Sequence, residues 1–94
     1  MNPKEKEVMD ILQEECAEVI QAVSKIRRFG IDNAKHDTGQ TNREHLEEEL
    51  GDMLAMIDIL MANNIVSWGN LHVAKRAKIE KLKKWSKIQN LDNI

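Results

Sequence analysis

The sequence contains no tyrosine, one phenylalanine and two tryptophans among its 94 residues. A hydrophobic core must therefore be built mainly from aliphatic side chains and methionine, which supply most of the 41% of residues that are apolar. A single cysteine excludes an intrachain disulfide, and one proline with four glycines leaves few positions for turns. These absences predict a small, helical domain without disulfides, of the kind expected in a reducing compartment.

Two further absences limit the partners of the chain. No apolar run approaches the roughly 20 residues that a membrane-spanning helix needs, and the first residues, MNPKEKE, form no apolar signal segment. We therefore expect a cytoplasmic protein with no membrane partner. The net charge of −2 is not that of a general nucleic-acid binder, so we expect no nucleic-acid partner.

The near-neutral charge hides a strong asymmetry along the chain. Residues 1–60 carry 14 acids and 7 bases, a net charge of −7, whereas residues 61–94 carry 2 acids and 7 bases, a net charge of +5. A functional interpretation should account for both the acidic first part and the basic tail of the chain.

The first predicted helix covers about residues 3–29. Asn2 can cap it, Pro3 suits its first position, and Glu5 stands three residues after the cap. Gly30 is a typical helix end. The apolar residues between these signals recur at spacings of three and four, the helical period: Val8, Ile11, Leu12, Cys16, Val19, Ile20, Val23 and Ile26. Cys16 is interpreted as a small buried hydrophobic residue.

Two more helices follow a polar loop over 30–41. Thr41 and Glu44 form a capping-box pattern, and apolar residues at helical spacing predict a second helix over 42–63. A third helix is predicted over 70–88. The fold class is therefore all-α: an antiparallel bundle of three or four helices in a single domain, 1–94. The second helix is apolar on more than one side after Met53, which predicts that a second subunit completes the bundle, in a homodimer or homotetramer.

Two pairs of acids interrupt the apolar stripes: Glu15 with Glu18, and Glu49 with Asp52. Glu15 and Glu49 stand at helical spacing from apolar neighbours, and the second acid of each pair follows one turn later. Like charges one turn apart repel each other, and burying them unpaired is unfavourable. Carboxylate oxygens suit Mg²⁺, with Mn²⁺ as the second choice, and the lack of nitrogen ligands argues against zinc. The short loop makes the two helices antiparallel neighbours, so the four carboxylates can form one metal site.

Other charged residues receive simpler interpretations. Glu44, Glu47 and Glu48 are expected on a solvated face. His45 stands one turn before Glu49, where it could support that carboxylate, but a surface position is favoured. Lysines recur at helical spacing in the basic tail, and Lys25 adds positive charge near the end of the first helix. Mg²⁺ with flanking lysines is the arrangement that a polyphosphate substrate needs.

The two acidic motifs resemble those of a known family. Glu14-Glu15-Cys16-Ala17-Glu18 and Glu49-Leu50-Gly51-Asp52 have the EExxE and ExxD forms of the MazG-like all-α nucleoside triphosphate pyrophosphohydrolases. The resemblance covers residues 8–62 and extends loosely over 78–85. It implies a helical protein that assembles as dimers or dimers of dimers and hydrolyses nucleoside triphosphates to the monophosphate and pyrophosphate.

The resemblance also implies roles for individual residues. Mg²⁺ would be held by Glu15, Glu18, Glu49 and Asp52. Glu14 would support these ligands or help to orient the attacking water, and Glu15 is the first choice for deprotonating that water. The departing pyrophosphate would be bound by lysines such as Lys78 and Lys81, with Lys25 as a further substrate contact. Trp68 is the better of the two tryptophans for stacking on a base.

Several alternatives stay open. Relatives often carry asparagine two residues before the lysine of the phosphate site, where this chain has Arg76 if Lys78 is that lysine. A phosphoribosyl-ATP pyrophosphohydrolase would show Tyr-His soon after the second motif, and the sequence has no tyrosine. A dUTP- or dCTP-specific enzyme fits the same motifs. A non-catalytic helical dimer or adaptor explains the amphipathic helices and the charge split, but not the acids within the apolar stripes.

Overall fold

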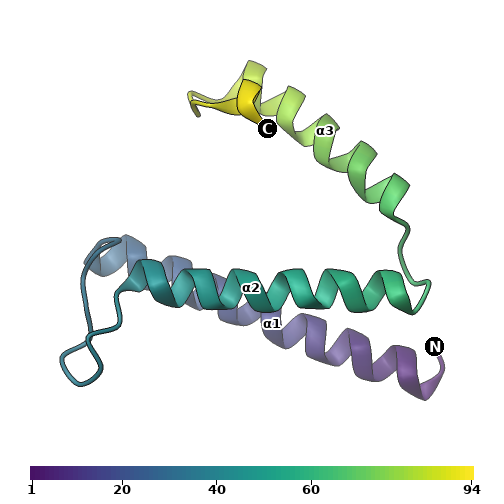
Figure 1. Ribbon diagram of the computed structural model, residues 1–94, viewed down its shortest axis with the longest axis horizontal. Coiled ribbons are helices and arrows are strands. Elements are labelled where there is room, and N and C mark those ends of the chain that lie inside the picture. Colours follow the sequence, from purple (N-terminus) through teal and green to yellow (C-terminus); the bar gives the residue numbers. More distant parts are fainter.

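The computed structural model describes all residues, 1–94, as three α-helices and one short 3₁₀ turn (Figure 1). Helix α1 is Pro3–Phe29, α2 is Asn42–Ala62, α3 is Trp68–Trp85, and the turn η1 is Leu91–Asn93. The only extended pairing is an isolated bridge between Ala34 and Thr41 in the first loop. The predicted all-α class is confirmed.

Both predicted capping boxes are present. The backbone N–H of Glu5 donates to Asn2 Oδ1 at 2.8 Å, and the backbone N–H of Glu44 donates to Thr41 Oγ1 at 3.1 Å. In each case the glutamate side chain accepts the backbone N–H of the capping residue in return. Helix α1 ends at Gly30, whose φ of 96° favours glycine. Helices α1 and α2 therefore begin where the sequence predicts.

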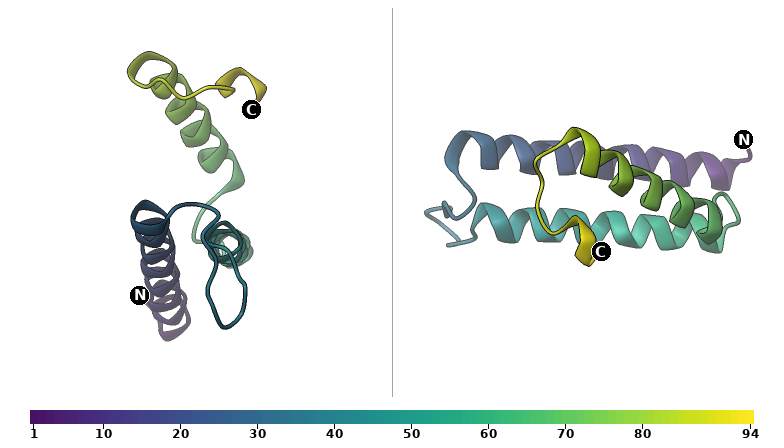
Figure 2. Two further views of the ribbon diagram at one scale, coloured as in Figure 1. Left: turned by 90° about the vertical axis from the view of Figure 1, so that its left-hand side faces the viewer. Right: turned by 90° about the horizontal axis from the view of Figure 1, so that it is seen from above.

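Helices α1 and α2 lie side by side and antiparallel (Figures 1 and 2). Ala22 is fully buried, and Met56 and Leu60 are nearly so. The core is thin, because no large side chain is fully buried and only six residues of the chain count as buried. This pair of helices is the structural unit that carries the acidic motifs.

The loop between α1 and α2 is tied to both helices. Asn42 is buried, and its Nδ2 donates to the carbonyl of Gly30 at 2.8 Å. The Arg43 side chain reaches back to both carboxylate oxygens of Asp32, at 3.0 and 3.3 Å, and its backbone N–H donates to the Ile31 carbonyl. These bonds hold the end of α1 beside the start of α2.

Helix α3 does not pack along the α1–α2 pair; it turns away after Ser67 and extends above it (Figure 1). The radius of gyration is 16.2 Å, whereas a compact chain of this length would have about 12 Å. Helix α3 instead contacts the C-terminal residues, where Ile79 and Leu91 are buried and Arg76 Nη1 donates to the Ile94 carbonyl at 2.7 Å.

Helix α3 starts and ends two to three residues earlier than predicted. Ser67 caps it by accepting the backbone N–H of Asn70 at 3.2 Å. At the other end the Ser86 hydroxyl donates to the Leu82 carbonyl at 2.7 Å, and Ser86 has extended backbone angles. Two serine caps, rather than the apolar pattern, therefore define this helix. No helix is long and apolar enough to cross a membrane.

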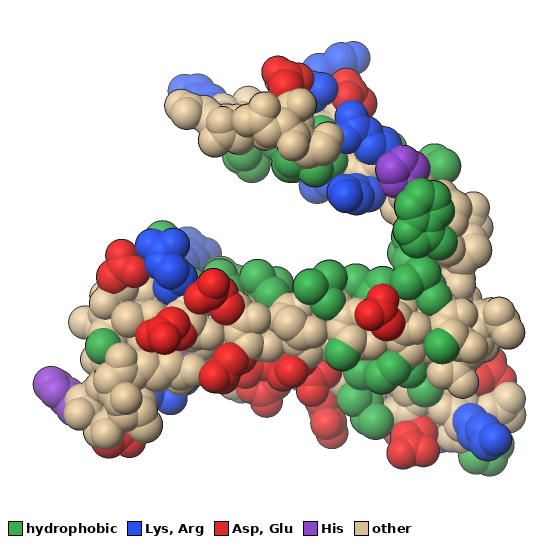
Figure 3. Space-filling view, viewed as in Figure 1, with side chains coloured by type: hydrophobic (Ala, Val, Ile, Leu, Met, Phe, Trp, Pro, Cys, Tyr) green, Lys and Arg blue, Asp and Glu red, His purple; other side chains and the backbone are tan.

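Apolar side chains cover the face of the α1–α2 pair that is turned toward α3 (Figure 3). Leu54, which lines a recess together with residues of α3, is 65% exposed, and Ile20 of α1 is 68% exposed. Cys16, one turn from Ile20 on α1, is also exposed, so its predicted burial is wrong for the single chain. The reason is that α1 packs along α2, which leaves the other sides of α1 uncovered.

Candidate metal centre

Three of the predicted acids meet between α1 and α2. One carboxylate oxygen each of Glu15, Glu49 and Asp52 lies within 4.8 Å of the other two. Glu49 and Asp52 are one turn apart on α2, and Glu15 faces them from α1. Glu15 and Glu49 are half-buried, and Asp52 is exposed. The antiparallel pairing of the helices therefore brings the two motifs together.

Glu15 is the most shielded acid of this cluster. Its Oε2 is buried and has no hydrogen-bond partner. A buried carboxylate oxygen normally has a partner, since otherwise its desolvation is uncompensated. A divalent cation fits the three convergent oxygens and would satisfy the unpaired one.

The electrostatics of the cluster agree with this interpretation. The pKa of Glu15 lies above its ordinary value, mainly because the carboxylate is desolvated. The negative charges of Asp52, Glu49, Glu18 and Glu14, in decreasing order, raise it further. Without a cation, the carboxylates of this cluster therefore repel one another.

The other two motif acids lie outside the cluster. Glu18 is exposed and is not among the three converging carboxylates, although its charge acts on Glu15. Glu14 is exposed and lines a recess with Asp10, Gln13 and Ala17, all of α1. The structure thus brings together three of the four predicted metal ligands.

His45 is a neighbour of the cluster that the sequence analysis placed on the surface. Its Nε2 lies 3.3 Å from Glu49 Oε1, and the two side chains are only 14% and 13% exposed. Its Nδ1 is buried without a hydrogen-bond partner. The predicted surface position is wrong, because the i,i+4 spacing places His45 on the same inward face as Glu49. The spacing of four residues between His45 and Glu49 is the sequence signal that could have predicted this inward position.

The basic side chains are distributed over two regions. Lys25 is half-buried and lines a recess of about 350 Å³ with Phe29, Lys35, His36 and other residues of the loop. It follows Glu18 by two helical turns, a rise of about 10 Å along α1. Lys78 and Lys81 are exposed on α3. Since α3 does not pack on the α1–α2 pair, one chain alone does not bring these two lysines to the carboxylates.

Trp68 stands at the start of α3 and is 66% exposed. Its ring stacks on His72, with centroids 4.9 Å apart and planes inclined by 7°. Both rings line a mostly apolar recess of about 410 Å³ between α2 and α3, together with Leu54, Ile57, Met61, Leu71 and Lys75. An exposed flat ring in such a recess can stack on a second flat ring.

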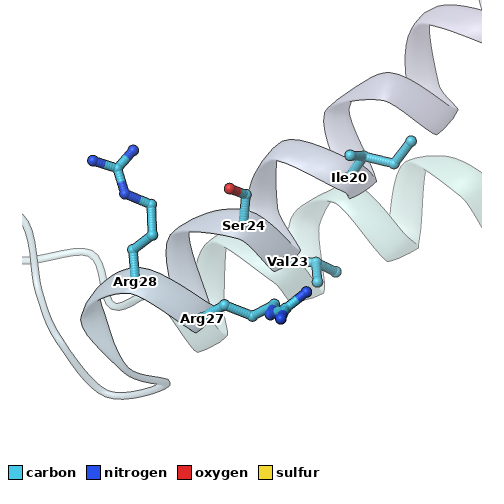
Figure 4. A pocket seen from close by; sticks show the side chains of 5 residues that line it. All are labelled: Ile20, Val23, Ser24, Arg27 and Arg28. Atoms are coloured by element: carbon cyan, nitrogen blue, oxygen red, sulfur yellow. The ribbon is translucent and has the colours of Figure 1, made fainter.

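The largest recess, of about 550 Å³, lies away from the acids, on α1. It is lined by Ile20, Val23, Ser24, Arg27 and Arg28, and Figure 4 shows the two arginines leaving the helix on different sides. It contains no acid that could hold a metal, and Ile20 and Val23 are exposed apolar residues. The carboxylate cluster, and not this larger recess, is therefore the candidate metal centre.

Comparisons with known proteins identify the family. Searches of curated proteins and of solved structures found no match. The family model of the MazG nucleotide pyrophosphohydrolase domain matches residues 4–87, which include both acidic motifs and all of α3. The chain therefore belongs to the MazG nucleotide pyrophosphohydrolase domain family.

Proposed function

We propose that this protein is a Mg²⁺-dependent nucleoside triphosphate pyrophosphohydrolase, with Mn²⁺ as an alternative ion. It would convert a ribo- or deoxyribonucleoside triphosphate and water into the monophosphate and pyrophosphate. The family supports pyrophosphohydrolase chemistry on nucleotides. The observation that carries the proposal is the set of three convergent carboxylates with the unpaired, buried Oε2 of Glu15.

The metal ligands in this proposal are Glu15, Glu49 and Asp52, with Glu18 as the fourth. Glu18 is one turn from Glu15 and exposed, and in this proposal its side chain rotates toward the site. When bound, Mg²⁺ would offset the charge of the phosphate oxygens and polarise them. The four acids would hold the ion. Residues 1–60 carry few bases relative to acids, so few cationic side chains compete with Mg²⁺ for these carboxylates.

The bond changes follow from the reaction. The oxygen of water forms a bond to the α-phosphorus, and the bond from this phosphorus to the α–β bridging oxygen breaks. Glu15 accepts the proton of the water as a general base, since its carboxylate lies within the cluster. Glu14, which precedes it on α1, helps to orient the water. Pyrophosphate leaves with the bridging oxygen.

Substrate binding uses the basic and aromatic residues. Lys25 contacts phosphate from the end of α1, and Lys78 and Lys81 offset the charge of the leaving pyrophosphate. Trp68 stacks on the base, since its ring is exposed beside an apolar recess.

A second copy of the chain completes the protein in this proposal, as a homodimer or a dimer of dimers. Large apolar side chains such as Ile20 and Leu54 are exposed, and apolar side chains cover the face of the α1–α2 pair beneath α3 (Figure 3). A contiguous apolar face of this kind is typical of an interface. In such an assembly, the α3 lysines of one copy would approach the carboxylate cluster of the other copy.

The test is pyrophosphate release from a panel of ribo- and deoxyribonucleoside triphosphates, with and without Mg²⁺. We expect turnover only with the metal. Glu15→Gln and Asp52→Asn should each lower kcat by about 10²-fold or more, since they remove a proton acceptor or a charged ligand.

Glu47→Gln is the matched control, because Glu47 is exposed on the same helix as Asp52 and is not part of the cluster. Its rate should equal that of the wild type. Turnover that survives both site substitutions unchanged would contradict the site. Absence of turnover with every nucleotide would favour the non-catalytic adaptor.

A further inference from the structure

His45 is the one histidine that touches the carboxylate cluster. Its ring stands one turn before Glu49 on α2, and the shortest distance is 3.3 Å, from Nε2 to Oε1 of Glu49. Both side chains are almost covered by protein, so water does not easily replace this contact. The other two histidines, His36 and His72, are exposed.

The two ring nitrogens of His45 have different surroundings. Nε2 faces a carboxylate oxygen, which accepts hydrogen bonds. Nδ1 is buried and has no hydrogen-bond partner. A proton on Nδ1 would be a buried donor without an acceptor, which is unfavourable, whereas a proton on Nε2 has a carboxylate oxygen 3.3 Å away. When the ring carries a single proton, its surroundings therefore place that proton on Nε2.

We propose that His45 is a positioning residue for the metal centre: its Nε2–H donates to Oε1 of Glu49 and holds the carboxylate so that Oε2 is free for the cation. Partners behind a ligand restrict its rotation and raise its affinity for the ion. A glutamate held in this way loses less side-chain entropy on binding metal than a free one. This inference rests on the metal site proposed above.

The test compares two substitutions at position 45. His45→Leu keeps an apolar side chain of similar bulk but has no donor. His45→Gln keeps an N–H donor that reaches a carboxylate one turn away. His36→Leu is the control, because His36 is exposed in the loop and lies outside the cluster.

The first measurement is Mn²⁺ affinity of the protein without nucleotide, by calorimetric titration or by electron paramagnetic resonance. We expect about tenfold weaker binding for His45→Leu, recovery of most of the affinity in His45→Gln, and no change in His36→Leu. In the Glu49→Gln background, His45→Leu should cause no further loss. Wild-type affinity in a folded His45→Leu variant, with the melting temperature as the measure of folding, would overturn the inference.

The second measurement needs no metal and remains valid if a variant fails to fold. A long-range ¹⁵N–¹H spectrum of the metal-free wild-type protein near pH 8.5, where histidine rings are normally neutral, reports which nitrogen carries the proton. We expect the proton of His45 on Nε2, and a neutral ring protonated on Nδ1 alone would overturn the inference.

The two measurements also separate this inference from the proposed function. If the wild-type protein binds no Mn²⁺ at all, the proposal of a metal site is wrong, whichever nitrogen of His45 carries the proton. If it binds Mn²⁺ with equal strength in the wild type and in His45→Leu, only the role of His45 is wrong.

Discussion

At the scale of single residues, Glu15 combines two opposing demands. Its carboxylate is desolvated and lies near four other acids, which raises its pKa. The same position gives it an unpaired oxygen beside Glu49 and Asp52. In the proposed metal site, a bound cation would offset this repulsion, and loss of stability in the metal-free state is a common compromise at functional sites.

Glu15→Gln should raise the melting temperature of the metal-free protein at pH 7–8. The raised pKa means that the folded state binds the Glu15 proton more tightly than the unfolded state does. The Glu15 contribution to stability therefore falls as pH increases from the ordinary pKa of 4.5 through the raised one. Glutamine removes this loss. The measurement is thermal unfolding in EDTA at pH 5 and pH 8, and the gain should appear mainly at the higher pH.

Glu7→Gln is the control for this prediction, because Glu7 is exposed on α1 and outside the cluster. It should leave the melting temperature nearly unchanged. Addition of Mg²⁺ should stabilise the wild type more than Glu15→Gln. A metal-free Glu15→Gln protein less stable than the wild type at pH 8 would refute the proposed repulsion.

Trp68→Ala should raise KM for the nucleotide and leave kcat nearly unchanged, since stacking holds the base and not the reacting phosphate. A base–aromatic stack contributes about 1–3 kcal/mol, so the increase in KM should be about 5-fold or more. Trp85→Ala is the matched control, since Trp85 is 84% exposed at the other end of α3. Nucleotide should quench the fluorescence of Trp85→Ala but not that of Trp68→Ala. Equal quenching in both would contradict the stacking role.

At the scale of elements, the caps and the loop set the register of the acids. The capping box of Thr41 and Glu44 defines the start of α2, and the bond from Asn42 to the Gly30 carbonyl ties that start to the end of α1. A change of register on α2 would move Glu49 and Asp52 off the inward face. The geometry of the metal centre thus depends on residues that are distant from it.

Thr41→Ala should lower the free energy of unfolding by about 1 kcal/mol, the usual effect of losing an N-cap. The backbone and hydroxyl of Thr41 lower the pKa of Glu44. The Glu44 contribution is therefore present above its ordinary pKa of 4.5 and is lost as pH falls through the lower pKa of the folded state.

Urea unfolding at several pH values checks both effects. Glu44→Gln should be less stable than the wild type at pH 7, and the difference should disappear at a pH below the folded-state pKa, where the wild-type side chain is also uncharged. A difference that persists unchanged at low pH would show that the Glu44 charge does not stabilise the cap.

At the scale of the whole molecule, the distinctive feature is incomplete burial. The radius of gyration of 16.2 Å exceeds the value of about 12 Å expected for a compact chain. The α3 helix has a small core of its own with the C-terminal residues, around Ile79 and Leu91. The apolar face beneath α3 is consistent with the proposed second copy.

Leu54→Glu should convert the proposed oligomer into monomers and reduce activity. A charge on the apolar face would have to be desolvated at the interface, which opposes association. Ala55→Glu is the control, because position 55 is exposed and lies on a different side of α2. Sedimentation analysis at micromolar concentration measures the masses, and a wild-type protein that sediments as a monomer would contradict the proposal.

Several parts of the structure could be predicted from local sequence signals. The capping patterns at Asn2 and Thr41, with Gly30 between them, give the bounds of α1 and the start of α2, because each depends on a few neighbouring residues. The spacing of the two motifs predicted that Glu15, Glu18, Glu49 and Asp52 would meet, and the antiparallel pairing of α1 and α2 brings together all of them except Glu18. The ends of α3 were missed because serine caps give a weaker signal than apolar periodicity.

What the amino-acid order alone decided about this protein is therefore local: an all-α chain, two capped helices and the acids on their inward faces. Only the tertiary structure decided what surrounds each side chain. Helical spacing places His45 and Cys16 on a face but not against a neighbour. In the structure the His45 side chain is only 14% exposed beside Glu49, whereas Cys16 is exposed. The physical reason is that burial depends on which elements pack together, and α3 packs on the C-terminal turn and not on the α1–α2 pair.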